Sequence, residues 1–183
     1  MIRKSRTYLL CALSCIFLLS ASAPAQNGLP PLIDREILFG NPEITGAQIS
    51  PDGKFIAFRK PHKGTLNIWV KRADEPFANA RLLTNEAKRP IRSFFWSRDG
   101  KFILFVNDQG GNENFNLYAV NPNEQPASGA EVPVARNLTN SEKVRTVGYN
   151  VPRTEPDAVY VGMNDRDPAW HDLYKLKIST GER

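Results

Sequence analysis

The chain has 183 residues, of which 41% are hydrophobic, 10% aromatic and 23% charged, and its formal net charge is +5. This composition favours a packed core over disorder, and with 12 glycines, 14 prolines and two cysteines it excludes collagen-like, coiled-coil and disulfide-rich classes. A basic chain raises the possibility of a nucleic-acid or acidic membrane partner, which depends on the residues that survive processing.

The first 25 residues are predicted to be a cleavable signal peptide. Three basic residues precede position 7, and residues 8–19 carry no charge. Twelve residues of helix rise about 18 Å, short of the roughly 30 Å of a bilayer core, so a membrane anchor is the weaker interpretation. Small residues then lead to Ala23-Pro24-Ala25, which places cleavage after Ala25 in preference to Ala23. A lipoprotein site at Cys15 fits less well, because the apolar stretch continues beyond it.

Cleavage there changes what the composition implies. Both cysteines, Cys11 and Cys15, leave with the signal, so the mature chain has no thiol and no cysteine-based metal site. Removing three of the 24 basic residues and none of the 19 acidic ones leaves a net charge of +2. We therefore expect an exported protein, periplasmic or secreted, with no nucleic-acid partner and no membrane attachment after cleavage. Its oligomeric state stays open.

Residues 26–43 form a lead segment. Within it, residues 32–39 are predicted to form a short helix that begins near Pro30-Pro31 and ends at Gly40-Asn41-Pro42.

A repeat organises the rest of the chain. Residues 49–58 read Ile-Ser-Pro-Asp-Gly-Lys-Phe-Ile-Ala-Phe and residues 96–105 read Trp-Ser-Arg-Asp-Gly-Lys-Phe-Ile-Leu-Phe, which separates Asp52 from Asp99 by 47 positions. In each copy an aromatic-rich run containing Asn67 or Asn116 follows, and a Leu-Thr pair closes the unit at 83–84 and 138–139. A third, blurred copy has its strand at 157–161 and Asp172 where the asparagine should stand.

The repeat predicts four short strands per unit. Pro51 suits the φ of a type I turn, the Asp52 carboxylate can accept nearby backbone N–H groups, and Gly53 tolerates a positive φ. The flanking runs are short, aromatic and β-branched, and the period of about 47 to 55 residues matches propeller blades. We predict an all-β, partial β-propeller over residues 44–183, with about two and a half four-stranded blades at roughly 44–84, 93–139 and 146–183, the last incomplete. Because propellers close with four to eight blades, the chain is expected to be part of a longer protein.

A search for catalytic groups assigns no catalytic, cofactor-binding or metal residue. No G-x-S-x-G elbow occurs, and Ser128, the nearest candidate, follows Pro126 and Ala127. His62 in its hairpin and His171 at the start of a strand are interpreted as exposed or turn histidines. No zinc site or other cofactor is expected.

Several charged motifs are also interpreted as structural. Residues 108–114 resemble a calcium loop, but Glu113 and Ala119 stand where Gly and Glu are needed, so a tight hairpin is preferred. Residues 165–168 are assigned to a turn, and Lys88, Arg89 and Arg92 to a solvated loop. The sequence Asn-Leu-Thr at 137–139 fits the N-glycosylation pattern, which has meaning only if the source glycosylates exported proteins in this way.

The pattern resembles the beginning of an exported serine peptidase of the prolyl oligopeptidase family, with its bacterial dipeptidyl-aminopeptidase and acylaminoacyl-peptidase-like members. The resemblance extends from residue 30 to about 178 and depends on Pro-Leu-Ile-Asp-Arg-Glu-Ile-Leu-Phe-Gly-Asn-Pro at 31–42, the two Asp-Gly repeats, Asn-Ile-Trp-Val at 67–70 and Asn-Glu-Asn-Phe-Asn-Leu-Tyr at 112–118.

This resemblance implies a C-terminal α/β-hydrolase domain that cleaves short peptides with a Ser, Asp and His triad, and a propeller that restricts access to it. None of the triad can be assigned to this chain, which is therefore expected to be inactive alone. Some relatives bind the substrate amine with a glutamate pair, but no adjacent Glu-Glu occurs and Asp74-Glu75 is not a match, so specificity stays open. Because TolB-type propellers share the Ser-Pro-Asp-Gly motif, a non-enzymatic periplasmic propeller that binds proteins or peptides is the alternative.

Overall fold

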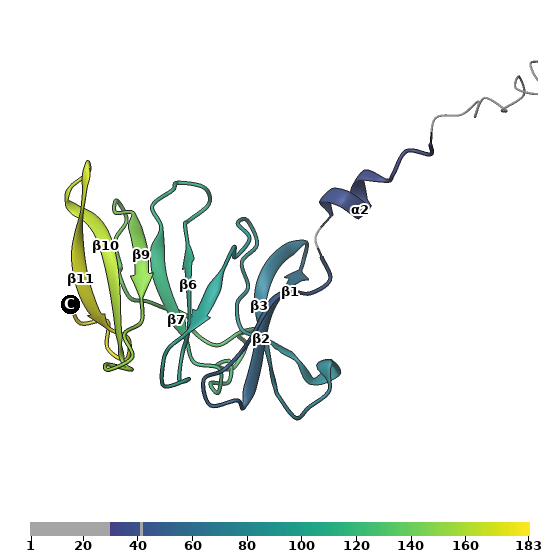
Figure 1. Ribbon diagram of the computed structural model, residues 1–183, viewed down its shortest axis with the longest axis horizontal. Coiled ribbons are helices and arrows are strands. Elements are labelled where there is room, and N and C mark those ends of the chain that lie inside the picture. The colour runs from purple at the N-terminus through teal and green to yellow at the C-terminus, as the bar shows by residue number, and fades with distance from the viewer. Residues whose placement is uncertain (1–29, 41) are drawn as a thin grey trace, which may run out of the picture. The chain divides into compact units, whose positions relative to one another are not determined.

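The computed structural model describes residues 30–40 and 42–183 (Figure 1). The predicted signal peptide, residues 1–25, lies outside the described residues. Within these ranges, no helix combines the length and apolarity needed to cross a membrane. The chain divides after Gly40 into two compact units.

The first unit contains the helix α2, Arg35–Phe39. The Asp34 carboxylate caps it by accepting a hydrogen bond from the backbone N–H of Glu36 at 2.9 Å. The predicted helix in this segment is confirmed, but it begins three residues later than expected, because Asp34 takes the non-helical N-cap conformation. Its apolar residues Ile37, Leu38 and Phe39 are all exposed.

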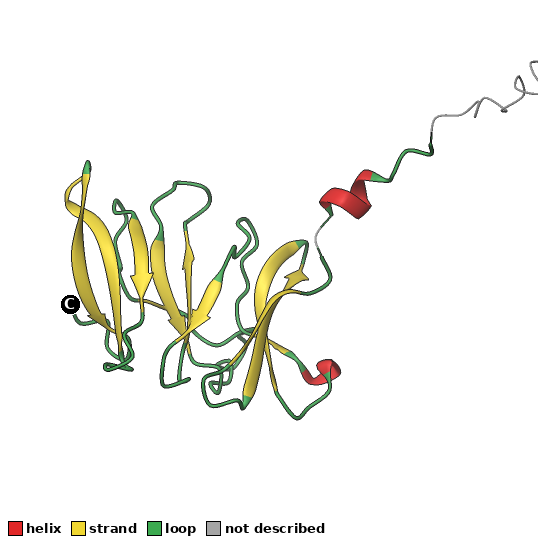
Figure 2. Ribbon diagram, viewed as in Figure 1, coloured by secondary structure: helices red, strands yellow, loops and turns green. Residues whose placement is uncertain are grey.

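The second unit consists of three antiparallel sheets (Figure 2). In the first sheet the order is β1 (Thr45–Ile49), β2 (Phe55–His62), β3 (Thr65–Arg72) and β4 (Arg81–Leu82), with a short 3-10 helix η1 (Phe77–Asn79) before β4. The second sheet repeats this order with β5 (Phe94–Trp96), β6 (Ile103–Asn107), β7 (Asn116–Val120) and β8 (Arg136–Asn137). The third contains β9 (Thr146–Asn150), β10 (Ala158–Asp167) and β11 (Trp170–Lys177). The predicted all-β, partial propeller fold is confirmed.

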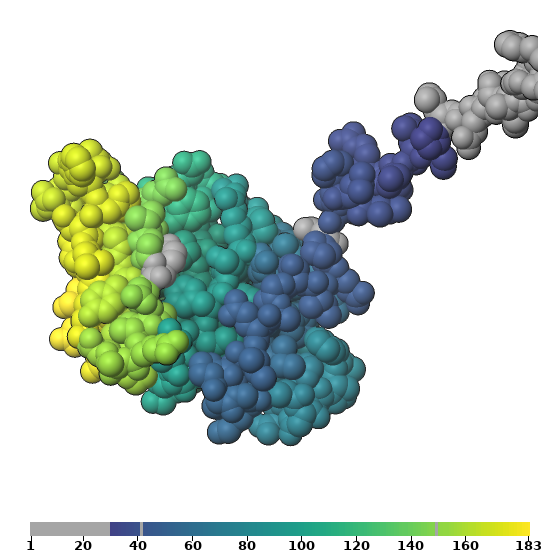
Figure 3. Space-filling view, in the orientation of Figure 1, coloured from purple at the N-terminus to yellow at the C-terminus, as the bar shows by residue number. Residues whose placement is uncertain are grey.

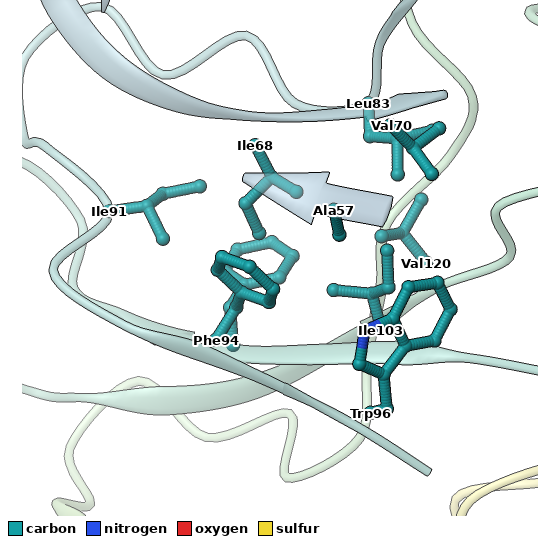
Figure 4. Packing of buried hydrophobic residues seen from close by; sticks show 10 residues of the cluster. Ala57, Ile68, Val70, Leu83, Ile91, Phe94, Trp96, Ile103 and Val120 are labelled. Atoms are coloured by element: carbon teal, nitrogen blue, oxygen red, sulfur yellow. The ribbon is translucent and has the colours of Figure 1, made fainter. Parts of the chain in front are cut away.

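Side chains that alternate along the strands fill two cores, one on each face of the second sheet. Residues directly opposite each other in an antiparallel pair share a face. One face of the second sheet packs on the first sheet, through Phe94, Trp96, Ile103, Phe105 and Val120 against Ala57, Ile68, Val70 and Leu83 (Figure 4). The other face packs on the third sheet, through Leu104, Leu117 and Ala119 against Val159, Val161, Met163, Leu176 and Ile178. The second sheet is thus covered on both sides (Figure 3).

The two Asp-Gly turns have the same hydrogen bonds. Lys54 N–H donates to the Asp52 carboxylate at 3.1 Å, and Lys101 N–H donates to Asp99 at 3.1 Å. Gly53 has a φ of 73°, which an L residue adopts only at a cost. The predicted turn chemistry is confirmed. A serine begins each turn and also closes it, since Phe55 N–H donates to the Ser50 hydroxyl at 2.9 Å, a bond the sequence interpretation did not include.

Because each sheet is an antiparallel meander, the successive connections between its strands alternate between the two ends of the sheet. One end, called here the hairpin end, carries the β2–β3, β6–β7 and β10–β11 hairpins and the connections between sheets at 83–93 and 138–145. The turn predicted at residues 165–168 is wrong in its extent, because residues 165–167 belong to β10 and the reversal starts at Pro168. The strand extends because Arg166 forms two hydrogen bonds with Asp172 of β11, at 2.6 and 2.9 Å.

Candidate functional site

One hairpin departs from the repeat at the hairpin end. Two residues join β2 to β3 and two join β10 to β11, whereas residues 108–115, called here the long hairpin, join β6 to β7. A hairpin is present where a tight one was predicted over residues 108–114, but it is not tight, because eight residues join its two strands. Where a repeat is broken by extra residues, those residues do not serve the packing that the repeat explains, which makes the long hairpin the candidate site.

Asp108 anchors the long hairpin at its base. Its side chain is 1% exposed, and its two carboxylate oxygens accept hydrogen bonds from Arg89 Nε and from Glu113 N–H, both at 3.1 Å. Burial by itself would raise the pKa of Asp108, but these donors outweigh it and hold the pKa below its ordinary value. Arg89 was expected in a solvated loop. It instead holds the hairpin from the neighbouring connection, because its charge and the Glu113 N–H together compensate the buried carboxylate.

Backbone conformation at the hairpin tip is unusual. Glu113 is a non-glycine residue with a φ of 60°, a left-handed conformation that costs about 1 to 3 kcal/mol. Its N–H bond to Asp108 holds it there. This bond thus stabilises the hairpin conformation that the structure shows.

Asn116, at the start of β7, ties the hairpin to the 138–145 connection. Its amide donates to the carbonyls of Asn114 and Ser141 at 3.1 and 2.8 Å, and its oxygen accepts from the Thr139 hydroxyl and from Ser141 N–H at 2.9 and 3.0 Å. We call this arrangement the asparagine bracket. Asn114 adds a further tie by donating to the carbonyl of Glu142 at 2.8 Å.

The first sheet contains the same bracket around Asn67. The Asn67 oxygen accepts from the Thr84 hydroxyl at 3.0 Å and from Glu86 N–H at 2.7 Å, and its amide donates to the Glu86 carbonyl at 3.0 Å. This explains the recurring asparagine and the Leu-Thr pair in the sequence. The threonine hydroxyl also accepts the N–H of the residue after the asparagine, at 2.9 Å for Ile68.

Between the long hairpin and the 138–145 connection lies a pocket of about 360 Å³. Its lining side chains are all polar: Gln109, Asn112, Asn114, Asn116, Asn137, Asn140, Ser141 and Glu142. Glu142 is the one charged residue of this lining. Amide groups both donate and accept, so such a pocket suits a ligand with paired N–H and C=O groups or hydroxyls.

A second group of side chains surrounds Asp108 on the same hairpin end. Burial raises the pKa of Glu86, and the nearby Asp108 charge adds to this, while the neighbouring Asn107 side chain opposes it. The Asn67 bracket fixes the Glu86 backbone, so its carboxyl is held beside the base of the long hairpin. Sequence reasoning missed Glu86, because only the bracket brings it close to Asp108, which is 22 positions away.

His62 and Ser128, two of the earlier candidates, belong to other surroundings. His62, interpreted as an exposed or turn histidine, ends β2 beside the two-residue turn, and its Nε2 lies 2.8 Å from Glu131 Oε1 in the 121–135 connection. Ser128 is exposed in the same connection. His171 is exposed on β11. Across the part of the chain that the structure describes, no three His, Cys, Asp or Glu side chains gather as metal ligands would.

The remaining motifs serve local structure. The Asn137 oxygen accepts from the N–H groups of Thr139 and Asn140, at 3.2 and 2.8 Å, so this side chain is engaged in its own turn. Asp74 accepts from Arg72 at 3.2 Å directly after β3. The site is therefore a fixed, polar surface suited to binding.

Comparison with known proteins gives two curated relatives. Dipeptidyl aminopeptidase BIII of Pseudoxanthomonas mexicana is 41% identical over 152 residues, which cover 83% of this chain and 21% of the relative. Dipeptidyl peptidase family member 6 of Caenorhabditis elegans is 28% identical over 153 residues, which cover 82% of this chain and 20% of the relative. The chain therefore spans about a fifth of the length of these relatives. No family model matches it.

A solved structure agrees with the fold. TolB from Acinetobacter baumannii superposes with a TM-score of 0.51 and 18% identity, covering 76% of this chain and 31% of that one. At this identity the likeness concerns the fold alone.

Proposed function

Since this chain is homologous to dipeptidyl peptidases and folds as a partial propeller, we propose that it is the N-terminal propeller part of an exported serine peptidase of the prolyl oligopeptidase family. The observation that carries the proposal is the 41% identity to dipeptidyl aminopeptidase BIII over 83% of the chain, a stretch that contains most of the repeated sheets. The structural similarity to TolB concerns the fold, which is compatible both with a peptidase propeller and with a non-enzymatic binding propeller.

In this proposal the chemistry takes place outside the chain. An α/β-hydrolase domain in the remainder of the protein would supply a serine nucleophile, a histidine base and an aspartate that orients the histidine. The substrates are short peptides, and the propeller limits which peptides reach the triad. A rigid cap suits this role, because the sheets are fastened to each other by arginine side chains, such as Arg98 Nε donating to the Val151 carbonyl at 3.0 Å.

The long hairpin is the part of this chain best suited to contact a peptide. Its pocket offers amide donors and acceptors that match a peptide main chain, and Glu142 carries the negative charge that a free amine prefers. Preorganisation by Asp108 and the asparagine bracket means that little conformational entropy is lost on binding.

The test is the protein expressed from its whole coding region. We expect it to hydrolyse dipeptidyl para-nitroanilides, to lose that activity when the serine of a downstream G-x-S-x-G motif is changed to alanine, and to be inactivated by a serine-directed phosphonate. A coding region that ends after about six blades, with no such motif and no hydrolysis, would contradict the proposal and favour a TolB-like binding propeller.

Export is tested separately by mass spectrometry of the protein recovered from the cell envelope or medium. We expect a mature N-terminus at Gln26, after cleavage behind Ala25. Recovery of the protein in the cytoplasm with residues 1–25 intact would contradict this part of the proposal.

A further inference from the structure

A second pocket lies at the end of the sheets opposite the hairpin end. It has a volume of about 530 Å³, within the range of small-molecule sites. Its lining comes from the strands that begin the three sheets, β1, β5 and β9, and from the Asp-Gly turns that follow β1 and β5. We call it the turn-end pocket. None of its lining residues belongs to the pocket beside the long hairpin.

Most of the turn-end pocket is apolar. Its lining includes Ile49, Phe95 and Trp96, and apart from Gln48, Arg98 and Asn150 it has no polar side chain. Ile49 is 63% exposed although it is a large apolar residue at the end of a strand, and the ring of Phe95 is half-buried. An apolar group of a ligand would therefore find a surface from which it can displace water.

Arg98 gives the turn-end pocket a positive charge. It is the one cation of the lining, and among the described residues no carboxylate lines this pocket. Its Nε donates to the Val151 carbonyl at 3.0 Å, while its two terminal nitrogens have no hydrogen-bond or ion-pair partner in the described part of the chain. Pro51 holds the same position in the first repeat copy, so the turn itself does not require an arginine. An oriented guanidinium with available N–H groups matches the two oxygens of a carboxylate.

The remaining polar groups of the lining are suited to a peptide group. The Gln48 amide donates to the Phe94 carbonyl at 2.8 Å, which leaves its oxygen to accept from a ligand, and Asn150 is exposed. Trp96 is 8% exposed, and its buried indole N–H has no acceptor among the described residues. Since buried donors are nearly always paired in folded proteins, this N–H is a further position for a ligand oxygen.

We propose that the turn-end pocket binds the carboxyl-terminal end of an apolar peptide. The terminal carboxylate pairs with Arg98, the last side chain of the peptide lies on Ile49 and Phe95, and the last peptide group contacts Gln48 and Asn150. This binding does not depend on the proposed peptidase activity, because none of these residues belongs to the candidate site described above.

Calorimetric titration of the protein expressed from its whole coding region tests this, with acetyl-alanyl-phenylalanine as the probe. Protein inactivated by the serine-directed phosphonate is used, so that binding at a catalytic serine is not counted. We expect the peptide acid to bind at least about tenfold more tightly than its carboxyl-terminal amide. Arg98→Gln should abolish this preference. Arg153→Gln, which removes an exposed cation two residues after Val151 and outside the lining, should retain it.

Ile49→Asn is the second variant, since Arg98→Gln also removes the donor to Val151 and can affect folding. We expect it to weaken binding of the acid and the amide alike, by about fivefold, because the apolar contact is lost.

Four results would overturn the proposal. Equal affinity of the wild-type protein for acid and amide would mean that Arg98 does not bind the carboxylate. An equal loss in Arg153→Gln would show a general effect of charge. Equally tight binding of 3-phenylpropionate would identify an aryl carboxylate instead of a peptide end as the ligand. Absence of binding at millimolar peptide would show that the pocket is not a site in the whole protein.

Discussion

The Asp108 carboxylate and the Arg89 guanidinium hold each other at the base of the long hairpin. A carboxylate whose pKa is lowered by folding stabilises the protein above its unfolded-state pKa of about 3.9, and this contribution is lost as the pH falls toward the folded-state pKa. Without Arg89, one of the groups that lower the pKa is removed while the burial that raises it stays. The acid sensitivity of the protein is therefore linked to this pair.

We predict that Arg89→Met lowers the free energy of unfolding most near pH 6, and that its difference from the wild type shrinks as the pH falls through the folded-state pKa of Asp108, because a less depressed folded-state pKa leaves less stability to lose on acidification. Urea denaturation between pH 6 and pH 2.5 measures this. Lys88→Met is the matched control, because it removes the neighbouring, exposed cation and leaves Asp108 paired. Coincident stability profiles for the two variants would show that Arg89 does not act on Asp108.

Asn112 belongs to the pocket lining and is exposed. Its side-chain oxygen accepts the Asn114 N–H at 3.0 Å within the long hairpin, which leaves its amide NH2 group to contact a ligand. If the pocket binds the peptide main chain equally well in the ground state and the transition state, removing one of its hydrogen bonds to the peptide raises KM and leaves kcat unchanged. We predict that Asn112→Ala raises KM for a peptide substrate about three- to tenfold, as expected for one hydrogen bond worth roughly 0.5 to 1.5 kcal/mol. Steady-state kinetics of the full-length enzyme checks this, and a changed kcat with unchanged KM would argue against a binding role.

At the scale of elements, the asparagine bracket joins a strand to the connection that leads to the next sheet. Asn116 is buried, and its side chain makes four hydrogen bonds. All four partner groups would lose a hydrogen bond if this side chain were removed. Leaving buried polar groups unpaired costs about 1 to 3 kcal/mol for each group.

We predict that Asn116→Ala lowers the free energy of unfolding by about 2 to 4 kcal/mol, since Ser141 and Thr139 lose partners at once. Asn123→Ala, in an exposed turn of the same sheet, is the control and is expected to cost less than about 0.5 kcal/mol. Equilibrium denaturation of the full-length protein compares the two. Similar losses for both variants would mean that the bracket contributes little.

The sequence predicts those elements whose information is local. The Asp-Gly turns around Asp52 and Asp99, the strands beside them and the helix near Phe39 all depend on neighbouring residues, and all are present. The sequence also exposed the recurrence of Asn67 and the Leu-Thr pair, but their hydrogen bonds required the fold, because the partners are separated by 17 positions.

The candidate site was less accessible to sequence reasoning. Arg89 and Asp108 are 19 positions apart, and His62 and Glu131 are 69 apart, so no spacing rule connects them. Residues 108–114 did draw attention by their composition, and the structure makes them the hairpin that departs from the repeat. The sequence signal that could have found the site is the difference in hairpin length between the repeat copies. The β6–β7 hairpin of the second copy is longer than the β2–β3 hairpin of the first, and its extra residues are not needed for packing the sheets.

For the whole molecule, the order of the sheets determines which surfaces need a partner. The second sheet is covered on both faces, while the third sheet leaves Leu173 exposed at 76% on its outer face. Apolar burial is worth about 25 cal/mol per Å², so an uncovered sheet face loses stability that a closed row of sheets would gain.

We therefore predict that residues 26–183, expressed alone, will associate or unfold in part. The uncovered face of the third sheet and the unpaired edges of the sheets offer sites at which copies can pair. Light scattering coupled to size exclusion is expected to show species larger than a monomer, and thermal unfolding to be broad or irreversible. Leu173→Lys should reduce association if this face mediates it, because a charge would then have to be buried against the partner. A monomer with one sharp, reversible transition would show that the three sheets are sufficient to form a stable fold by themselves.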